Sequence, residues 1–364
     1  MPAVPDIEDF RSFFLTYLES VEPVIATTDA VPSEARARLA HLGALRLVVP
    51  AEHAGFDLSM VDYLPYLEIA AMGPAVGRML VHIANGVWRP IAAFGTSSQQ
   101  ELIRRIGEGS SVVALAITEP RGTGRNLMTQ AVKRNNGWSI TGRKHLVTFA
   151  NSADVFIVLA ITDDSEPTMF MLDRRLEGLT IVPQPRMGLS GIGLGEVRLD
   201  AVQVDDACVL GGRGDGFKVV DSFLNASRVS LAGCMVGLAQ RALDIASDFA
   251  RQRVTFGKAI GERQAVQVRL ANMHAAVSAG RALVRDSALR ADSGSDFSVE
   301  AATAKLFCSE MVCSVTESAL RIFGGVGYLA ESVVQRLHRD ARAFLFEEGT
   351  SEVQQLLIAR ALLA

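Results

Sequence analysis

The sequence has few of the residues that build metal or disulfide sites. Its four cysteines, Cys208, Cys234, Cys308 and Cys313, form no C-x-x-C pair, and its six histidines lack the H-E-x-x-H spacing of zinc enzymes. We therefore expect no metal site, and we interpret the cysteines as buried, reduced thiols.

Long apolar runs and an excess of basic charge are also missing. No stretch approaches about 18 uninterrupted apolar residues, so no membrane span is expected, and the opening MPAVPDIEDF lacks the features of a secretory signal. The formal net charge of -4 argues against a nucleic-acid partner. We expect a cytoplasmic protein without membrane or nucleic-acid partners, whose 49% apolar content is absorbed partly by buried interfaces between subunits.

The texture of the chain changes twice along its length. Helical periodicity runs from about 6 to 108, short β runs such as VFIVLAI and EVRLDAVQV follow to about 205, and helical periodicity then returns to the end. This order predicts an α+β fold and excludes a doubly wound sheet. We expect an all-α N-terminal domain at 1–110, a β-barrel or sandwich domain at 111–212 and a helical domain, built as a four-helix bundle, at 213–364.

Glycine clusters occur at several places, but none spells G-x-G-x-x-G between a strand and a helix. A Rossmann nucleotide site is therefore not expected, and turns account for most such clusters. The cluster GGVGY at 324–328 lies in a helical region, where each glycine costs about 1 kcal/mol relative to alanine. Close approach of a cofactor phosphate or of a partner helix would explain it.

Two further features are compatible with a bound heterocycle. Thr118 and Thr148 follow β runs, where hydroxyls can meet polar ring atoms, although such threonines are usually structural. The segment RQRVTFGKAIGERQ at 251–264 leaves a helix through a basic turn around Phe256. It suits a diphosphate and a stacked ring, and it equally suits a solvated helix end.

The stretch FLFEEGTSEV at 344–353 places two glutamates beside apolar residues. Ser351 and Gln354 fit a capping box, so a helix is expected to begin just after Gly349. In an extended approach Glu347 and Glu348 would point to opposite faces, so that one carboxylate is buried and the other lies in water. The buried carboxylate would be a candidate for proton transfer.

Several separated motifs together resemble the acyl-CoA dehydrogenase family over nearly the whole chain. They are VPAEHAGFDLS, ALAITEP, GWSITGRKHLVTFANSADVFIVLA, RQRVTFGKAIGERQAVQ, RIFGGVGY, LHRDAR and FEEGTSEVQQLLIAR, in the order of the family. The resemblance implies a flavoenzyme that holds FAD and desaturates an acyl thioester, of coenzyme A or of a carrier protein, between Cα and Cβ.

The resemblance also implies roles for single residues. Glu348, directly before Gly-Thr, matches the catalytic base, whereas Ser227 stands where one branch of the family carries its base, so that branch is not supported. Arg228 and Gly349 are expected to contact the substrate, and Glu347 to be turned away. The residues that the resemblance assigns to FAD are Thr118, Thr148, Arg253, Thr255, Phe256, Gln264, Arg321, Gly324, Gly325, Thr350 and Glu352. FAD would lie at a subunit interface, which implies a homodimer or homotetramer, and the electrons would pass to a flavoprotein or to oxygen.

The sequence departs from the family pattern at several positions. TEPRGTGR, in the loop Arg121–Arg125, carries Gly124 and Arg125 where the family usually has Ser and Asp, Leu146 replaces a frequent Trp, and Arg321 replaces a frequent Gln. The changes suggest an unusual substrate or carrier. Two alternatives stay open: a flavin oxidase or monooxygenase on the same fold, and a non-catalytic subunit that pairs with an active homologue.

Overall fold

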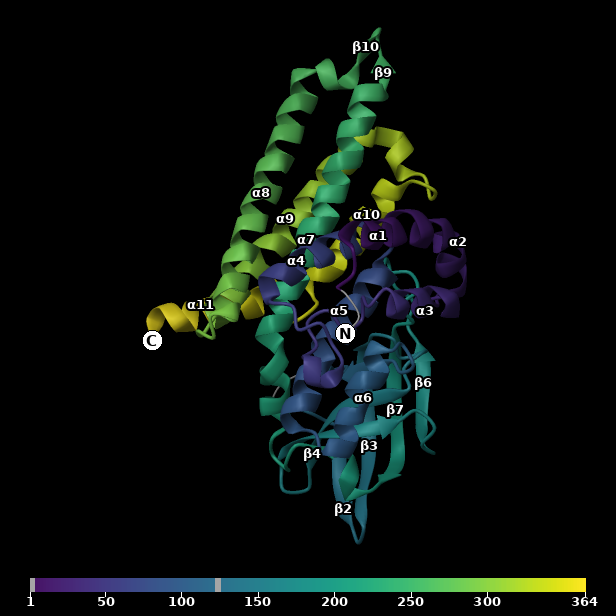
Figure 1. Cartoon of the computed structure of the whole chain (residues 1–364), viewed down its shortest axis with the longest axis vertical. Helices are drawn as coiled ribbons and strands as arrows, with labels where there is room; N and C mark the ends of the chain where they lie inside the picture. The colour runs from purple at the N-terminus through teal and green to yellow at the C-terminus, as the bar shows by residue number, and fades with distance from the viewer. Residues whose placement is uncertain (1–3, 122–125) are drawn as a thin grey trace.

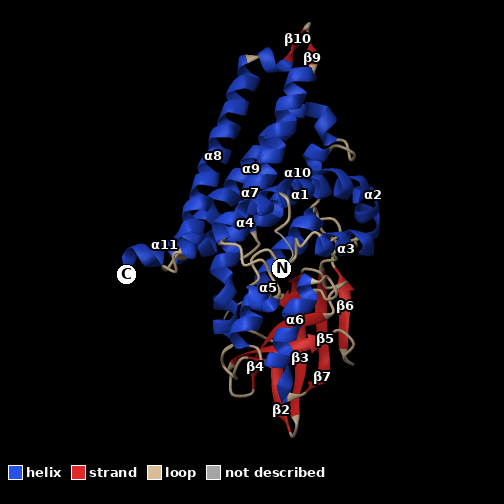
Figure 2. Cartoon of the chain, in the orientation of Figure 1, coloured by secondary structure: helices blue, strands red, loops and turns tan. Residues whose placement is uncertain are grey.

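The computed structural model of the protein describes residues 4–121 and 126–364. Long helices form one end of the molecule and a β-sheet forms the other (Figures 1 and 2). Helix α5 (Ala75–Phe94) lies where the two parts meet, in contact with both the long helix α7 and strand β1. This arrangement confirms the predicted α+β fold class.

Helices make up the N-terminal part of the chain. They are α1 (Ile7–Ser12), the π-helical η1 (Phe13–Leu18), α2 (Glu19–Thr28), α3 (Ser33–His41), the 3-10 turn η2 (Ala51–His53), α4 (Met60–Met72), α5 and α6 (Ser97–Gly107). Helix α6 begins at a capping box, in which Gln99 N donates to Thr96 Oγ1 and Thr96 N donates to Gln99 Oε1. The side chains of these two residues therefore fix the start of α6.

The middle of the chain forms one eight-stranded, mostly antiparallel sheet. Its strands are β1 (Val113–Ala116), β2 (Gln130–Arg134), β3 (Gly137–Val147), β4 (Val155–Thr162), β5 (Pro167–Asp173), β6 (Leu179–Pro183), β7 (Gly195–Val204) and β8 (Val209–Leu210), with the 3-10 turn η3 (Asp206–Cys208) before β8. The order is β6-β7-β3-β2-β4-β5-β8, and β1 pairs in parallel with β4. Strand β4 is almost continuously apolar because it is buried along its length.

The C-terminal part is helical again. It contains α7 (Gly216–Gln252), the hairpin β9 (Val254–Thr255) and β10 (Lys258–Ala259), η4 (Ile260–Glu262), α8 (Gln264–Asp292), α9 (Ser298–Phe323), η5 (Gly324–Tyr328), α10 (Val333–Ala341), η6 (Arg342–Leu345) and α11 (Ser351–Leu363). The long helices α7, α8 and α9 pack against one another, and α10 and α11 pack on α9.

Helix α7 holds the molecule together. Its length and apolar composition would allow it to cross a membrane, but 78% of its apolar window is buried inside the fold. Apolar residues three or four positions apart, among them Val229, Ala232 and Val236, are fully buried. Contacts with α4, α5, α8 and α9 use this surface, so α7 fixes the residues it carries relative to the N-terminal helices.

Candidate active site

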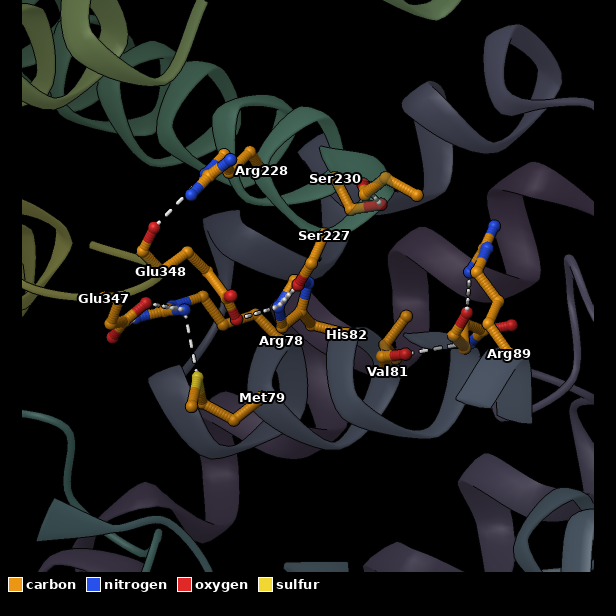
Figure 3. Close-up of polar contacts among 12 residues, drawn as sticks. Arg78, Met79, Val81, His82, Arg89, Ser227, Arg228, Ser230, Glu347 and Glu348 are labelled. Carbon is orange, nitrogen blue, oxygen red and sulfur yellow. Dashed lines mark hydrogen bonds and ion pairs between the residues drawn. The ribbon is translucent and has the colours of Figure 1, made fainter. Parts of the chain in front are cut away.

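The two adjacent glutamates lie on the turn between η6 and α11 (Figure 3). The predicted extended conformation is wrong, because the chain there leaves a 3-10 helix through a turn and Glu348 adopts the left-handed region at φ 56°. The expectation of one buried and one wet carboxylate is also wrong, since the side chains of Glu347 and Glu348 are 19% and 20% exposed. Both carboxylates therefore belong to the interior of the site.

Side chains from three helices hold the turn in this shape. Arg228 Nε donates to the carbonyl of Glu348 at 3.3 Å, and Lys305 Nζ donates to the carbonyl of Gly349 at 2.6 Å. The buried Gln354 donates to both carbonyls, at 3.1 and 3.2 Å. A left-handed residue other than glycine costs about 1–2 kcal/mol, and these contacts offset that cost. The direction of the Glu348 side chain is thus set by tertiary contacts.

Helix α11 begins one residue earlier than a Ser351 N-cap would allow. Thr350 is the N-cap residue and Ser351 is the first helical residue, so the predicted Ser351–Gln354 capping box is wrong. Gln354 is buried against the turn instead, and Ser351 Oγ donates to Glu310 at 3.2 Å. The side-chain amide of Gln354, which was expected to cap the helix, instead donates to the backbone of the turn that carries the glutamates.

Glu347 forms an ion pair with a buried arginine. Arg78, on α5, is fully buried and donates to Glu347 through Nη1 at 3.2 Å and Nη2 at 3.0 Å (Figure 3). Its guanidinium lies over the ring of Phe344. Burial alone would lower the pKa of Arg78, but the charge of Glu347 raises it above its ordinary value. The two residues form a charge-neutral pair, and Glu347 is not turned away from the site as expected.

Glu348 instead faces a histidine and a serine. Its Oε1 lies 3.7 Å from His82 Nε2, and the same nitrogen is hydrogen-bonded to Ser227 Oγ at 3.2 Å (Figure 3). His82 comes from α5, one turn after Arg78, and Ser227 comes from α7, directly before Arg228. Three segments far apart in the sequence therefore meet at the Glu348 carboxylate.

Two further cations border this cluster. Burial lowers the pKa of Arg228, although the charge of Glu348 acts against that effect. Burial also lowers the pKa of Lys305, which the charges of Glu347 and Glu348 oppose. Because both cations contact backbone carbonyls at the turn, they act on the position of Glu348 and leave its carboxylate directed toward His82.

A second polar cluster lies at the end of the sheet. Glu119 and Lys144 form a buried ion pair at 2.6 Å, and Glu119 also accepts from the backbone of Met128 and Thr129. Thr118 precedes Glu119, and its carbonyl accepts from His145 N at 2.8 Å. The pair therefore joins the segment after β1 to the end of β3, which Thr148 follows.

Family comparisons agree with this architecture. The chain matches the models of the acyl-CoA dehydrogenase N-terminal domain at 7–109, middle domain at 114–202 and C-terminal domain at 214–363. The chain belongs to the acyl-CoA dehydrogenase family. An acyl-CoA dehydrogenase of Bacillus subtilis is 32% identical over 97% of this chain and 96% of its own length. Members of this family are flavin oxidoreductases that act on CH–CH groups.

Solved structures extend the comparison. Butyryl-CoA dehydrogenase from Megasphaera elsdenii is 30% identical, with a TM-score of 0.92 and full coverage of both chains. The prolyl acyl carrier protein oxidase AnaB is 28% identical, with a TM-score of 0.88 and 98% coverage of both chains. Acyl-CoA dehydrogenase folds thus accompany different acyl groups and carriers.

The residues that the acyl-CoA dehydrogenase resemblance assigned to FAD do not meet within one chain. Thr118 and Thr148 lie at the sheet, whereas the hairpin β9–β10 lies at the opposite end of the molecule (Figure 1). Near that hairpin are Arg253, Thr255, Phe256, Gln264, Arg321, Gly324 and Gly325; Thr350 and Glu352 lie at the start of α11. The predicted FAD residues therefore form separate groups in the described chain.

The residues near the hairpin, which we call the far group, are mostly exposed. The ring of Phe256 is 96% exposed, and a Cβ built on Gly324 or Gly325 would meet nothing within 4 Å. Arg263 donates to Thr255 Oγ1 at 3.0 Å. Arg321 is exposed and engaged by Glu317 on its own helix at 3.0 Å, so an anion there would compete with Glu317.

Arg78 and His82 were not predicted as site residues. Their signal is their i, i+4 spacing in the apolar segment VGRMLVHIANG, which places a guanidinium and an imidazole on one face of a buried helix. Gly124 and Arg125 of the altered loop lie outside the described residues. Among the residues that the structure does describe, no group of His, Cys, Asp and Glu could hold a metal ion.

Proposed function

We propose that the protein removes two hydrogens across the Cα–Cβ bond of an acyl thioester, and that Glu348 is the base that takes the α-proton. The division of labour between the two glutamates carries the proposal. Glu347 is ion-paired with Arg78, whereas Glu348 has no Arg or Lys ion pair in the described part of the chain. Glu348 is therefore the carboxylate that remains available to a substrate.

The fixed position of Glu348 suits this role. The α-proton of a thioester is weakly acidic, so its base must be held within about 3 Å of the proton. Arg228, Lys305 and Gln354 restrain the turn at its carbonyls and leave the carboxylate free to accept a proton. The α-proton would go to Glu348, and the β-hydrogen would leave with both electrons of its bond.

FAD, when bound, supplies the acceptor for that hydride. Thr118 and Thr148 would bind its flavin ring, because the Glu119–Lys144 pair holds the two segments together. Arg253, Thr255, Phe256, Gln264, Gly324 and Gly325 would bind its diphosphate and adenine from a neighbouring copy. The open space at the two glycines and the exposed ring of Phe256 support this assignment.

The test is the variant Glu348→Gln, which keeps shape and hydrogen-bonding capacity but removes the base. We expect it to retain FAD and to bind thioesters, while substrate-dependent bleaching of the flavin in stopped-flow experiments falls by on the order of 10³-fold or more. Glu331→Gln, at an exposed carboxylate, is the control and should bleach at the wild-type rate. Normal bleaching in an FAD-loaded Glu348→Gln protein would show that the base lies elsewhere.

The similarity to AnaB, which is described as an oxidase, favours a second candidate function. In that case the reduced flavin would react with oxygen and need no protein acceptor. Mixing the substrate-reduced protein with air-saturated buffer separates the two functions, because an oxidase recovers its flavin absorbance rapidly. A dehydrogenase remains reduced until an electron-accepting flavoprotein is added.

A further inference from the structure

The cluster in front of Glu348 is unusually polar for a site that would hold a hydrocarbon chain. His82 and Ser227 face each other at 3.2 Å, and each is only 6% exposed. Both lie beside the carboxylate that would act on the substrate (Figure 3). Buried polar groups are costly unless they are hydrogen-bonded, so their partners in the working protein carry information about the ligand.

Ser227 differs from other serines of its own helix. Ser222, Ser230 and Ser247 donate their hydroxyls to carbonyls three or four residues earlier in α7, at 2.7, 3.0 and 2.8 Å. The hydroxyl of Ser227 instead turns toward His82, across the gap between α7 and α5. A hydroxyl has one donor and two acceptor sites, so contact with His82 leaves Ser227 with further capacity.

His82 has unused capacity as well. Its Nδ1 is buried, and within residues 4–121 and 126–364 this nitrogen has no hydrogen-bond partner. Nε2 is already hydrogen-bonded to Ser227 and lies near Glu348, so only Nδ1 of the imidazole is without a partner among the described residues. An alkyl chain packed here would bury the remaining sites of both residues without partners, which is the arrangement that proteins avoid.

The charges around His82 and Ser227 restrict which substrate groups can bind there. Arg78 is fully buried, and Glu347 already engages two of its nitrogens. Arg228 and Lys305, which border the cluster, already donate to Asn225 and to the carbonyls of Glu348 and Gly349, so a second carboxylate on the substrate would have to compete for a cation. A neutral group that donates or accepts hydrogen bonds fits better than either a charged group or a hydrocarbon.

We propose that His82 and Ser227 form a polar acyl subsite, and that the substrate is a short acyl thioester whose chain carries a neutral hydrogen-bonding group, such as a hydroxyl. This inference rests on the proposed function of Glu348. Since a base lies about 3 Å from the proton it takes and His82 Nε2 lies 3.7 Å from Glu348 Oε1, the polar group belongs on one of the first few atoms beyond Cα. His82 and Ser227 then set specificity without taking part in proton abstraction.

The test compares two acyl groups with the same number of non-hydrogen atoms, 4-hydroxybutyryl and pentanoyl. Both are offered as pantetheine thioesters, the portion common to coenzyme A and carrier-protein substrates. Binding to the FAD-loaded Glu348→Gln protein is measured by titration calorimetry, so that no turnover intervenes. We expect the hydroxylated ligand to bind at least about tenfold more tightly, because sites built for a hydroxyl reject analogues that lack it.

The same titrations on Ser227→Ala and His82→Leu, each combined with Glu348→Gln, assign the preference. Each change should bring the two affinities within about twofold of one another. Ser230→Ala is the matched control, since Ser230 is bonded within the same helix and should preserve the preference. Equal or tighter binding of the pentanoyl ligand to the parent protein would overturn the polar subsite. If neither ligand bound, the proposed function would fail with it.

Discussion

The guanidinium of Arg78 is fully buried, and Glu347 compensates its charge. Removing one partner of such a pair leaves an isolated charge in a region of low polarity, which is far costlier than losing an exposed ion pair. Glu347 thus contributes to the active site by keeping Arg78 and α5 in place. His82 is one turn further along the same helix, so this pair also positions the residue that faces Glu348.

Glu347→Gln should therefore lower stability more than it lowers chemistry. We expect the free energy of unfolding to fall by on the order of 3 kcal/mol, because Arg78 stays charged and loses its anion. Urea unfolding of the FAD-loaded protein would measure the change, and flavin bleaching at low temperature should remain within about tenfold of wild type. The double variant Arg78→Met, Glu347→Gln is the control and should recover part of the loss. Similar stability of Glu347→Gln and wild type would contradict a compensating role for Glu347.

Single residues of the site were predictable to different degrees. Glu348 could be identified because a family motif of consecutive residues surrounds it. The partner of Glu347 could not, because Arg78 is 269 positions away and only packing of α5 against the η6–α11 turn brings the two together. The i, i+4 spacing of Arg78 and His82 indicates a shared helix face, but local pattern alone does not say what that face meets.

The helices, strands and turns were also predictable from the sequence to different degrees. Helix α7 and strand β4 follow from apolar patterns that are local properties of the chain. The turn at Glu348 does not, because donors 120 and 44 positions away, Arg228 and Lys305, hold it in a left-handed conformation. The extended approach that was expected there is replaced by a turn, which these tertiary contacts hold in place.

The Glu119–Lys144 ion pair links the segment after β1 to strand β3. Burial alone would raise the pKa of Glu119, but hydrogen bonds from Lys144 and from the backbone of Met128 hold it below its ordinary value. A carboxyl whose pKa is lowered by folding stabilises the fold above its unfolded pKa of about 4.3. That contribution is lost as the pH falls through the folded pKa.

Glu119→Gln should accordingly be less stable than wild type at pH 7 and should lose less stability on acidification below about pH 4. Urea unfolding at pH 7, 5, 4 and 3 measures how the stability of each protein changes with pH. Glu177→Gln, at an exposed carboxylate of the same part of the chain, should follow the wild-type curve. Parallel curves for Glu119→Gln and wild type would mean that the ion pair contributes no pH-dependent stability.

At the scale of the whole molecule, exposed apolar residues collect on the elements that carry the far group of predicted FAD residues and on α11. Phe256 and Tyr328 are 96% and 86% exposed, and Leu362 and Leu363 are 77% and 87% exposed. Large exposed apolar patches are typical of protein interfaces. The patches support our proposal that identical copies associate there, with each FAD shared between the sheet of one copy and the hairpin of another.

A cofactor shared between copies would link FAD retention to association of the copies. Arg253 is exposed just after α7, and a guanidinium suits a diphosphate because it can donate two parallel hydrogen bonds. If this arginine binds the FAD of a neighbouring copy, Arg253→Ala should weaken FAD retention and association of the copies together, since a ligand bound across an interface stabilises it. Arg251→Ala is the matched control, because Arg251 is also exposed but is paired with Asp248 on its own helix. Measured by flavin absorbance per chain and by light scattering, the Arg253→Ala variant should lose FAD and shift toward smaller species, and the Arg251→Ala variant should not.

A wild-type protein that is monomeric with FAD bound would contradict the shared site. A wild-type protein that takes up no FAD at all would favour the non-catalytic subunit instead.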